Sequence, residues 1–427
     1  MKRILIFLLL VSVPEIYTSG QSLNFNDSIA LYFQEIQANT AHYKDLWNRD
    51  LYGPILLVNP RSRKIYTNFP DSARVLTKDG KIFTGLLPLH INIANTSITW
   101  NGRSWAMIML PLPGSRQDRL SLLSHELFHR SQPALGFHIS NAENNHLDER
   151  EGRVYLRLEL EALRRAMTSK TSTEKHDHLT NAMFFRKIRY SIFPDAATSE
   201  NLLELNEGIA EYTGTMMSGR NDEETEKYLE IKLVEFQNNP TFVRSFAYIT
   251  TPLYGFILQR SDRYWNRNLT GTTNLTEYFT NAFGLSVPAN LCAECISQYG
   301  SEKIMAEEIK RDEAKVERIA AYRSQFIIKP HLNIGLENMR ISFDPRNLMP
   351  LERYGTVYPT MRVSDNWGIL TVTEGALIGT NWDKVTLSEP VFITPYKVTG
   401  NGWILELYKG YFVEKDSTNG NYLLKKR

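Results

Sequence analysis

The sequence predicts an α+β protein in which a mixed N-terminal lobe, a helical lobe and a C-terminal all-β domain follow one another. Apolar and polar residues alternate in short runs up to about residue 110, which is the two-residue period of strands. From residue 115 to about 325 the period is helical, and from about 329 the alternation returns. Of the 427 residues, 42% are hydrophobic and 22% are charged, which suffices for several cores and excludes a disordered chain.

Residues 1–20 have the pattern of a cleaved secretory signal. Lys2 and Arg3 precede an apolar run over residues 4–13, about half of the ~20 residues needed to cross a bilayer, and small residues occur at 18–20. We therefore expect an exported protein, periplasmic or extracellular, with no stable membrane insertion after cleavage of the signal. The formal net charge of +2 favours neither nucleic acid nor an acidic membrane as a partner.

The N-terminal α/β lobe is expected to span residues 21–115. A helix is predicted within residues 27–47, and Asn101-Gly102 is typical of the tight turn of a β-hairpin. Short β-rich runs bounded by turn-forming residues predict strands at 54–58, 64–67, 81–84, 97–100 and 105–110.

The helical lobe is expected at 116–328 and a small β-sandwich or barrel at 329–427. Helical periodicity predicts helices at 116–132, 148–167, 201–217, 223–237, 242–260 and 301–325. In the C-terminal domain, alternation predicts strands at 368–373, 389–393 and 402–408.

The cysteines, Cys292 and Cys295, are expected to form a local disulfide or to be two idle thiols, because a zinc site would require further ligands nearby.

The segment His125-Glu126-Leu127-Phe128-His129 is an H-E-x-x-H motif on a predicted helix. A capping-box pattern begins this helix at residue 115 and Pro133 ends it, so both histidines belong to one helix. Residues at i and i+4 share a helix face, which allows His125 and His129 to bind one Zn²⁺ with Glu126 beside the open coordination position.

A catalytic zinc needs a third protein ligand, and the sequence offers two candidates. Glu149 lies twenty positions after His129, in an acidic segment that is typical of an exposed helix start. Glu207 lies in Asn206-Glu207-Gly208-Ile209-Ala210-Glu211, where the small residues Gly208 and Ala210 permit close helix packing. Glu211, four residues after Glu207, is placed to accept the free N–H of a metal-bound imidazole, and this favours Glu207.

Together, H-E-L-F-H and the later L-N-E-G-I-A-E-Y resemble the motifs of the gluzincin zinc peptidases, over roughly residues 97–260. The resemblance implies a zincin-like catalytic core with one zinc per chain bound by His125, His129 and Glu207. It also implies Glu126 as the general base and Glu211 as the hydrogen-bond partner of a ligand. The sequence departs from the family in spacing, since 76 residues separate His129 from Asn206, and a helical hairpin at 149–167 and 179–190 is expected to bridge them.

Two further assignments follow from this resemblance. Tyr254, beside Pro252 and Gly255, is predicted to stabilise the oxyanion, and Tyr248, His138 and His146 are weaker alternatives. The strand at 105–110 is predicted to be the edge strand bordering the cleft, where a peptide is held by strand addition. Its Ala106-Met107-Ile108-Met109 lacks the G-x-M-x-N segment of the aminopeptidase branch.

The sequence therefore predicts an exported zinc metallopeptidase that hydrolyses peptide bonds by Glu126-assisted attack of a zinc-bound water on a peptide or protein substrate. Two alternatives stay open. One is a gluzincin-fold protein that binds metal or peptide without turnover. The other is a zinc hydrolase that acts on a non-peptide amide.

Overall fold

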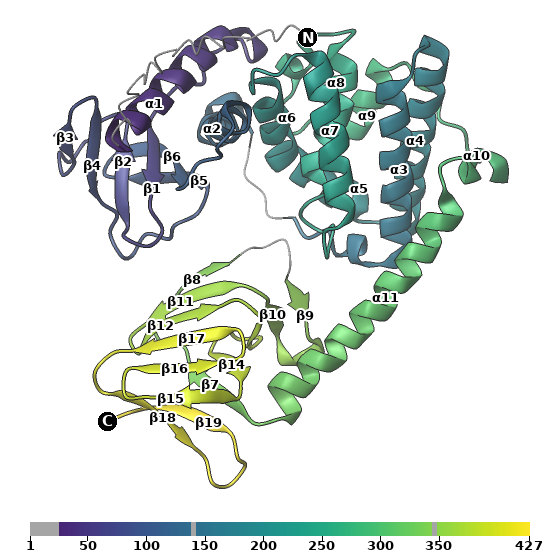
Figure 1. The fold of residues 1–427 in the computed structure, drawn as a ribbon. Coiled ribbons are helices and arrows are strands. Elements are labelled where there is room, and N and C mark those ends of the chain that lie inside the picture. Colours follow the sequence, from purple (N-terminus) through teal and green to yellow (C-terminus); the bar gives the residue numbers. More distant parts are fainter. Residues whose placement is uncertain (1–24, 138–141, 344–347) are drawn as a thin grey trace, which may run out of the picture.

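The structure is a computed structural model that describes residues 25–137, 142–343 and 348–427 (Figure 1). The predicted signal at residues 1–20 and the alternative site residue His138 lie outside the described residues. The predicted α+β class is confirmed, with a sheet near the N-terminus, helices in the middle and further sheets near the C-terminus. Among the described residues, no helix is both long enough and apolar enough to cross a membrane.

The N-terminal lobe is a sheet with a helix on one face. Its elements are α1 (Phe25–His42), a 3-10 helix (Lys44–Leu46), β1 (Ile55–Val58), β2 (Lys64–Thr67), β3 (Thr77–Asp79), β4 (Ile82–Leu86), β5 (Thr96–Trp100) and β6 (Arg103–Met109). The strand order is β3-β4-β2-β1-β6-β5, with β1 parallel to β6 and the other neighbours antiparallel. The predicted hairpin turn is present, with positive φ at Asn101 and Gly102.

The two faces of this sheet are both apolar. Ile55 and Leu57 of β1 pack on one face against α1 and α2 (Arg116–Ser131), whereas Leu56 and Val58 pack on the other face with Trp105 and Met107 of β6. Because successive side chains of a strand point to opposite faces, the continuous apolar run of β1 is that of a strand buried on both sides. One face of the sheet therefore supports α2, the helix that carries the H-E-x-x-H motif (Figure 1).

The middle of the chain is helical. Its remaining helices are α3 (Arg150–Thr168), α4 (Ser172–Ile192), α5 (Ala196–Leu203), α6 (Ile209–Met216), α7 (Asp222–Gln237), α8 (Ala247–Gln259), α9 (Leu275–Ala282), α10 (Ala293–Ser297) and α11 (Ser301–Arg323). One-turn π segments occur at Glu204–Gly208 and Ser324–Ile328, and 3-10 helices at Gln132–Leu135, Asn145–Asp148 and Trp265–Asn268. Helices α3 and α4 form the expected antiparallel hairpin between the two motifs (Figure 1).

One prediction about these elements is wrong. The strand at 105–110 corresponds to β6, which is not an edge strand, because β5 pairs with its outer side and is itself the edge. The helix expected at 201–217 is present without a break from Ala196 to Met216, and the π turn Glu204–Gly208 lies within it, between α5 and α6.

The long helix α11 leads from the helical lobe to a C-terminal β domain (Figure 1). Within its described residues, one sheet has the order β18-β19-β7-β14-β13-β10-β9 and the other β15-β16-β17-β12-β11-β8, with a shared apolar core. The strands are β7 (His331–Gly335), β8 (Arg340–Phe343), β9 (Met349–Pro350), β10 (Thr356–Tyr358), β11 (Met361–Asp365), β12 (Gly368–Val372), β13 (Ala376–Ile378), β14 (Lys384–Ser388), β15 (Pro390–Ile393), β16 (Lys397–Gly400), β17 (Trp403–Leu407), β18 (Tyr411–Lys415) and β19 (Tyr422–Lys426), with a 3-10 helix at Glu352–Tyr354. Cys292 and Cys295 form a disulfide at α10.

Candidate metal centre

Helix α2 positions the H-E-x-x-H side chains. The Ser115 hydroxyl caps its first turn by accepting a hydrogen bond from the backbone N–H of Asp118. Leu120, Leu123 and Leu127 are buried on the face that packs against the sheet. His125, Glu126 and His129 line a cavity elsewhere on the same helix.

Helix α6 lies close against α2, which brings the second motif to the first. A Cβ atom at Gly214 of α6 would come within 2.7 Å of the backbone oxygen of Ser121 and 3.3 Å of the His125 Cβ. Just before the start of α6, a Cβ atom at Gly208 would come within 2.1 Å of the Thr251 hydroxyl on α8. The small residue at 208 therefore permits the close helix packing expected from the sequence, with α8 as the neighbour.

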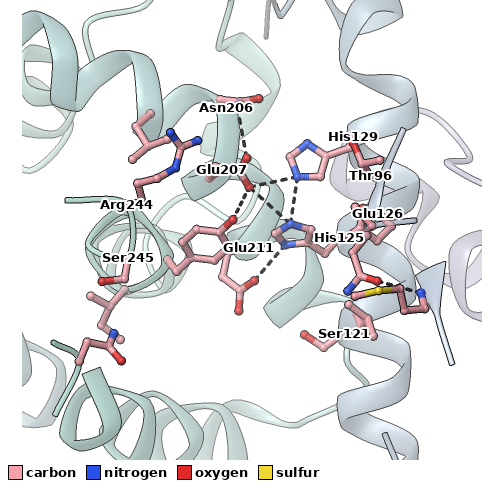
Figure 2. Close-up of a pocket in the computed structure, with 18 of the residues that line it drawn as sticks. Thr96, Ser121, His125, Glu126, His129, Asn206, Glu207, Glu211, Arg244 and Ser245 are labelled. Carbon is pink, nitrogen blue, oxygen red and sulfur yellow. Dashed lines mark hydrogen bonds and ion pairs between the residues drawn. The ribbon is translucent and has the colours of Figure 1, made fainter. Parts of the chain in front are cut away.

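His125 and His129 of α2 meet Glu207 of the π turn (Figure 2). The His125 Nε2 and His129 Nε2 atoms are 3.0 Å apart, and the Glu207 Oε2 atom lies 3.2 Å from the latter and 3.8 Å from the former. A point equidistant from these three atoms is about 2.0 Å from each, which matches the about 2.0–2.2 Å of zinc bonds to imidazole and carboxylate.

Hydrogen bonds on the far side of each imidazole assign its tautomer. The His125 Nδ1–H donates to Glu211 Oε2 at 2.9 Å, since a carboxylate can only accept. The side-chain amide of Gln132 donates from Nε2 to the backbone oxygen of Asn206 at 2.7 Å. Its Oε1 therefore faces His129 Nδ1, at 2.7 Å, and accepts a hydrogen bond from it.

Both Nε2 atoms consequently present lone pairs to each other and to a carboxylate oxygen. Three acceptors within 4.8 Å repel one another unless a cation lies among them. Burial opposes protonation of His125, but the Glu207 and Glu211 carboxylates beside it hold its pKa well above its ordinary value. Burial opposes ionisation of Glu207, but the two imidazoles beside it favour its charged form and hold its pKa well below the ordinary value. The three ligand atoms and the negative electrostatic potential around them therefore fit a bound cation.

Glu126 is buried next to this group, with 4% of its surface exposed. Burial raises the pKa of its carboxyl group. Within the part of the chain that the structure describes, no hydrogen-bond donor reaches its Oε2 atom. A buried carboxylate oxygen without a partner, in a cavity wall beside the candidate metal ligands, is placed to accept a proton from a molecule in the cavity.

Tyr254 does not belong to this site, so its prediction as the oxyanion donor is corrected. Its side chain is fully buried on α8, and its hydroxyl donates to Glu159 Oε1 at 3.1 Å, away from the cavity. Tyr248, considered a weaker candidate, lines the cavity instead, and its hydroxyl donates to Glu207 Oε2 at 2.6 Å. Its ring stacks on that of His125, and burial together with the Glu207 carboxylate raises its pKa.

The other candidates lie elsewhere. Glu149 is exposed at the start of α3 and outside the cavity, so it does not meet the histidines. His146 bonds to the buried Glu200 at 2.7 Å and is also outside the cavity. Gln132 was not predicted, and its only sequence signal is a polar residue between the motif helix and Pro133.

The cavity in front of the site has a volume of about 1110 Å³. One wall is the edge strand β5, represented by Thr96 and Ser97, and another is formed by α7 and α8. The C-terminal domain adds a third wall through β8, β11 and β12, including Phe343 and Arg362. This contribution was not predicted, because the sequence of that domain carries no motif that indicates it.

Comparison of the chain with protein-family models, with curated proteins and with solved structures gave no significant match.

Proposed function

We propose that the protein is a zinc-dependent peptidase. The observation that carries the proposal is the convergence of two imidazole nitrogens and one carboxylate oxygen beside the unpaired, buried oxygen of Glu126. Two nitrogen ligands and one oxygen ligand form the three-residue set of an open catalytic zinc site. The cavity in front of it has room for a substrate of several residues.

His125, His129 and Glu207 would hold the zinc, and Glu211 and Gln132 would orient the two imidazoles. A zinc ion bound there supplies Lewis-acid polarisation of a carbonyl and lowers the pKa of water toward ~7. Glu126 takes the proton of the attacking water and delivers it to the leaving amine, for which its raised pKa is suited. In this reaction the zinc supplies the polarisation, and a side chain of the protein, Glu126, carries out the proton transfer.

Tyr248 is the residue that the geometry favours as the oxyanion donor. Its hydroxyl reaches the Glu207 oxygen that faces the histidines, so it lies at the edge of the metal group and in the cavity. A phenol that donates to the developing oxyanion acts only in the transition state. Tyr248 therefore replaces Tyr254 in this role.

The edge strand β5 is the feature that favours a peptide over other amides. It lies beside β6 at the end of the sheet, and its residues Thr96 and Ser97 line the cavity. An edge strand offers backbone donors and acceptors to an extended chain, and strand addition binds peptides irrespective of most side chains. The location proposed is outside the cytoplasm, which the pattern of residues 1–20 and the Cys292–Cys295 disulfide support.

Hydrolysis of a peptide library tests this proposal. The purified protein is incubated with peptides of mixed sequence after zinc removal and after zinc restoration, and the products are read by mass spectrometry. We expect new termini at peptide bonds, dependent on restored zinc. Zinc binding without cleavage of any peptide would support a protein that binds without turnover, and cleavage of acylated amines alone would support a non-peptide amidase.

Substitution of the two tyrosines of α8 separates a catalytic from a structural hydroxyl. Tyr248→Phe is expected to lower kcat and kcat/KM by roughly 10²–10³ with little change in zinc content. Tyr254→Phe is expected to leave kcat unchanged and to cost about 1 kcal/mol of stability, because it loses a buried hydrogen bond. Steady-state kinetics and thermal unfolding of both variants check this, and unchanged kcat in Tyr248→Phe would remove Tyr248 from the mechanism.

A further inference from the structure

A buried group of charged side chains lies next to the segment of Glu207 but does not line the cavity. It joins the hairpin α3–α4 to the segment that carries Glu207. Its members have no exposed side-chain surface and are Glu159 of α3, Arg186 and Arg189 of α4, Glu200 of α5 and Glu204 of the π turn. Burial of five charged groups is costly unless each is paired, so such a group is retained only where pairing is nearly complete.

One pair in this group holds the π turn directly. Arg186 donates from Nη1 and Nη2 to the two oxygens of Glu204, at 2.9 and 2.8 Å, and from Nε to Glu159 at 2.7 Å. The Thr250 hydroxyl on α8 adds a third hydrogen bond to Glu204, at 2.6 Å. A two-pronged Arg–carboxylate pair fixes orientation as well as distance, so Glu204 is held from both α4 and α8.

The π turn explains how Glu204 and Glu207 reach opposite partners. In a continuous α-helix, residues at i, i+3 and i+7 share a face, which would place Glu204 beside Glu207 and Glu211. In the π turn the Ile209 N–H bonds to the Glu204 oxygen, five residues back, and this changes the rotation between the side chains. Glu204 thereby meets Arg186 of the hairpin, while Glu207 meets the histidines.

We propose that Arg186 and Glu204 are a positioning pair, through which the inserted α3–α4 hairpin holds the π turn so that the Glu207 carboxylate faces His125 and His129. The inference rests on the proposed role of Glu207 as a metal ligand. Neither residue of the pair lines the cavity, so their effect on the metal passes through Glu207. The long insertion between the two motifs therefore serves as the support of the third ligand.

The chain contains a matched control in the same buried group. Arg189 donates from Nε and Nη2 to the two oxygens of Glu200, both at 2.7 Å, and also pairs with Glu159. Both pairs are fully buried and join α4 to the segment between residues 196 and 208. Glu200 lies on α5, before the π turn, so its loss removes a second buried Arg–carboxylate pair, together with the contacts of Glu200 with His146 and Tyr190, without releasing the turn.

The test compares Arg186→Met/Glu204→Met with Arg189→Met/Glu200→Met in the full chain. Zinc dissociation constants are measured by competition with a chromogenic chelator, and thermal unfolding is measured without metal. We expect the first double variant to lose about 10–100-fold in zinc affinity and the second to keep the wild-type affinity, at similar unfolding temperatures. Equal zinc affinity in the two double variants would overturn the proposal.

Two additional measurements keep the test decisive. If either double variant does not fold, Glu204→Gln and Glu200→Gln preserve side-chain shape, and only the former is expected to weaken zinc binding. Amide hydrogen exchange of residues 204–208 in metal-free protein is expected to become faster only when the Arg186–Glu204 pair is removed. Because neither measurement uses hydrolysis, a wild-type protein that binds zinc but cleaves no peptide would defeat the proposed function and leave this inference intact.

Discussion

The Glu126→Gln variant is expected to keep its zinc and its fold and to lose peptide hydrolysis by about 10²–10⁴-fold or more. The amide has nearly the shape of the carboxylate but cannot take a proton from the attacking water. The Glu126 Oε2 atom accepts no hydrogen bond from the described residues, so the substitution breaks no pairing there. The values of kcat/KM and of zinc content per chain, measured side by side, check this result.

Glu149→Gln is the matched control for this variant. It makes the same chemical change at an exposed glutamate outside the cavity, and its turnover is expected to equal that of the wild type. Near-normal turnover in Glu126→Gln would contradict Glu126 as the general base. Loss of zinc together with activity would instead show that Glu126 maintains the site.

Substitution of the proposed third ligand, Glu207, has the second large expected effect. Glu207→Ala is expected to remove most of the zinc, because two imidazoles alone do not complete the three-ligand set of a catalytic site. Glu207 also accepts the hydrogen bond of the Tyr248 hydroxyl, so the variant loses the carboxylate on which several groups converge. Metal analysis after dialysis, with Glu149→Ala as the control, measures this effect.

The two variants together decide between the candidate ligands. Zinc retained in Glu207→Ala and lost in Glu149→Ala would transfer the ligand role to Glu149. The structure leads to the opposite expectation, because Glu149 is exposed and the Glu207 carboxylate lies 3.2 Å from the His129 Nε2 atom.

The shared face of His125 and His129 and the shared face of Glu207 and Glu211 could be predicted because both depend on local spacing. His125 and His129 are one turn apart on any helix, whatever surrounds it. The four-residue spacing from Glu207 to Glu211 likewise gave both residues a common face, and the structure brings Glu211 to His125. The H-E-x-x-H helix, several flanking strands and the α3–α4 hairpin were predicted close to their observed bounds for the same reason.

The choice between Tyr254 and Tyr248 could not be made from local pattern. The two residues lie six positions apart on α8, so they point to different sides of the helix. Nearly every residue of α8 is buried, and a helix that is apolar all round gives no sign of which side faces a cavity. The prediction of Tyr254 depends on the turn-forming residues Pro252 and Gly255 beside it. In the structure, Gly255 instead allows the rings of Tyr212 and Trp265 to pack closely against α8.

The edge strand and the π turn depend on distant contacts. The strand at 105–110 leads into the H-E-x-x-H helix as expected, and the predicted Asn101-Gly102 hairpin joins it to β5, but the strand order was needed to show that β5 is the edge strand. The residues 204–208 have an ordinary helical pattern, and their π geometry accompanies the pairing of Glu204 with Arg186, eighteen positions earlier. Contacts of this kind are not encoded in the period of a single segment.

The X-ray absorption spectrum of the zinc-loaded wild-type protein at the zinc edge is the most direct test of the proposed metal centre. We expect one zinc per chain with two imidazole ligands, further nitrogen or oxygen atoms at about 2.0–2.2 Å and no sulfur. A sulfur shell at about 2.3 Å would place the metal on thiolates of Cys292 and Cys295 instead. That spectrum, or a wild-type protein that retains no zinc, would contradict the assignment of His125, His129 and Glu207 as the metal centre.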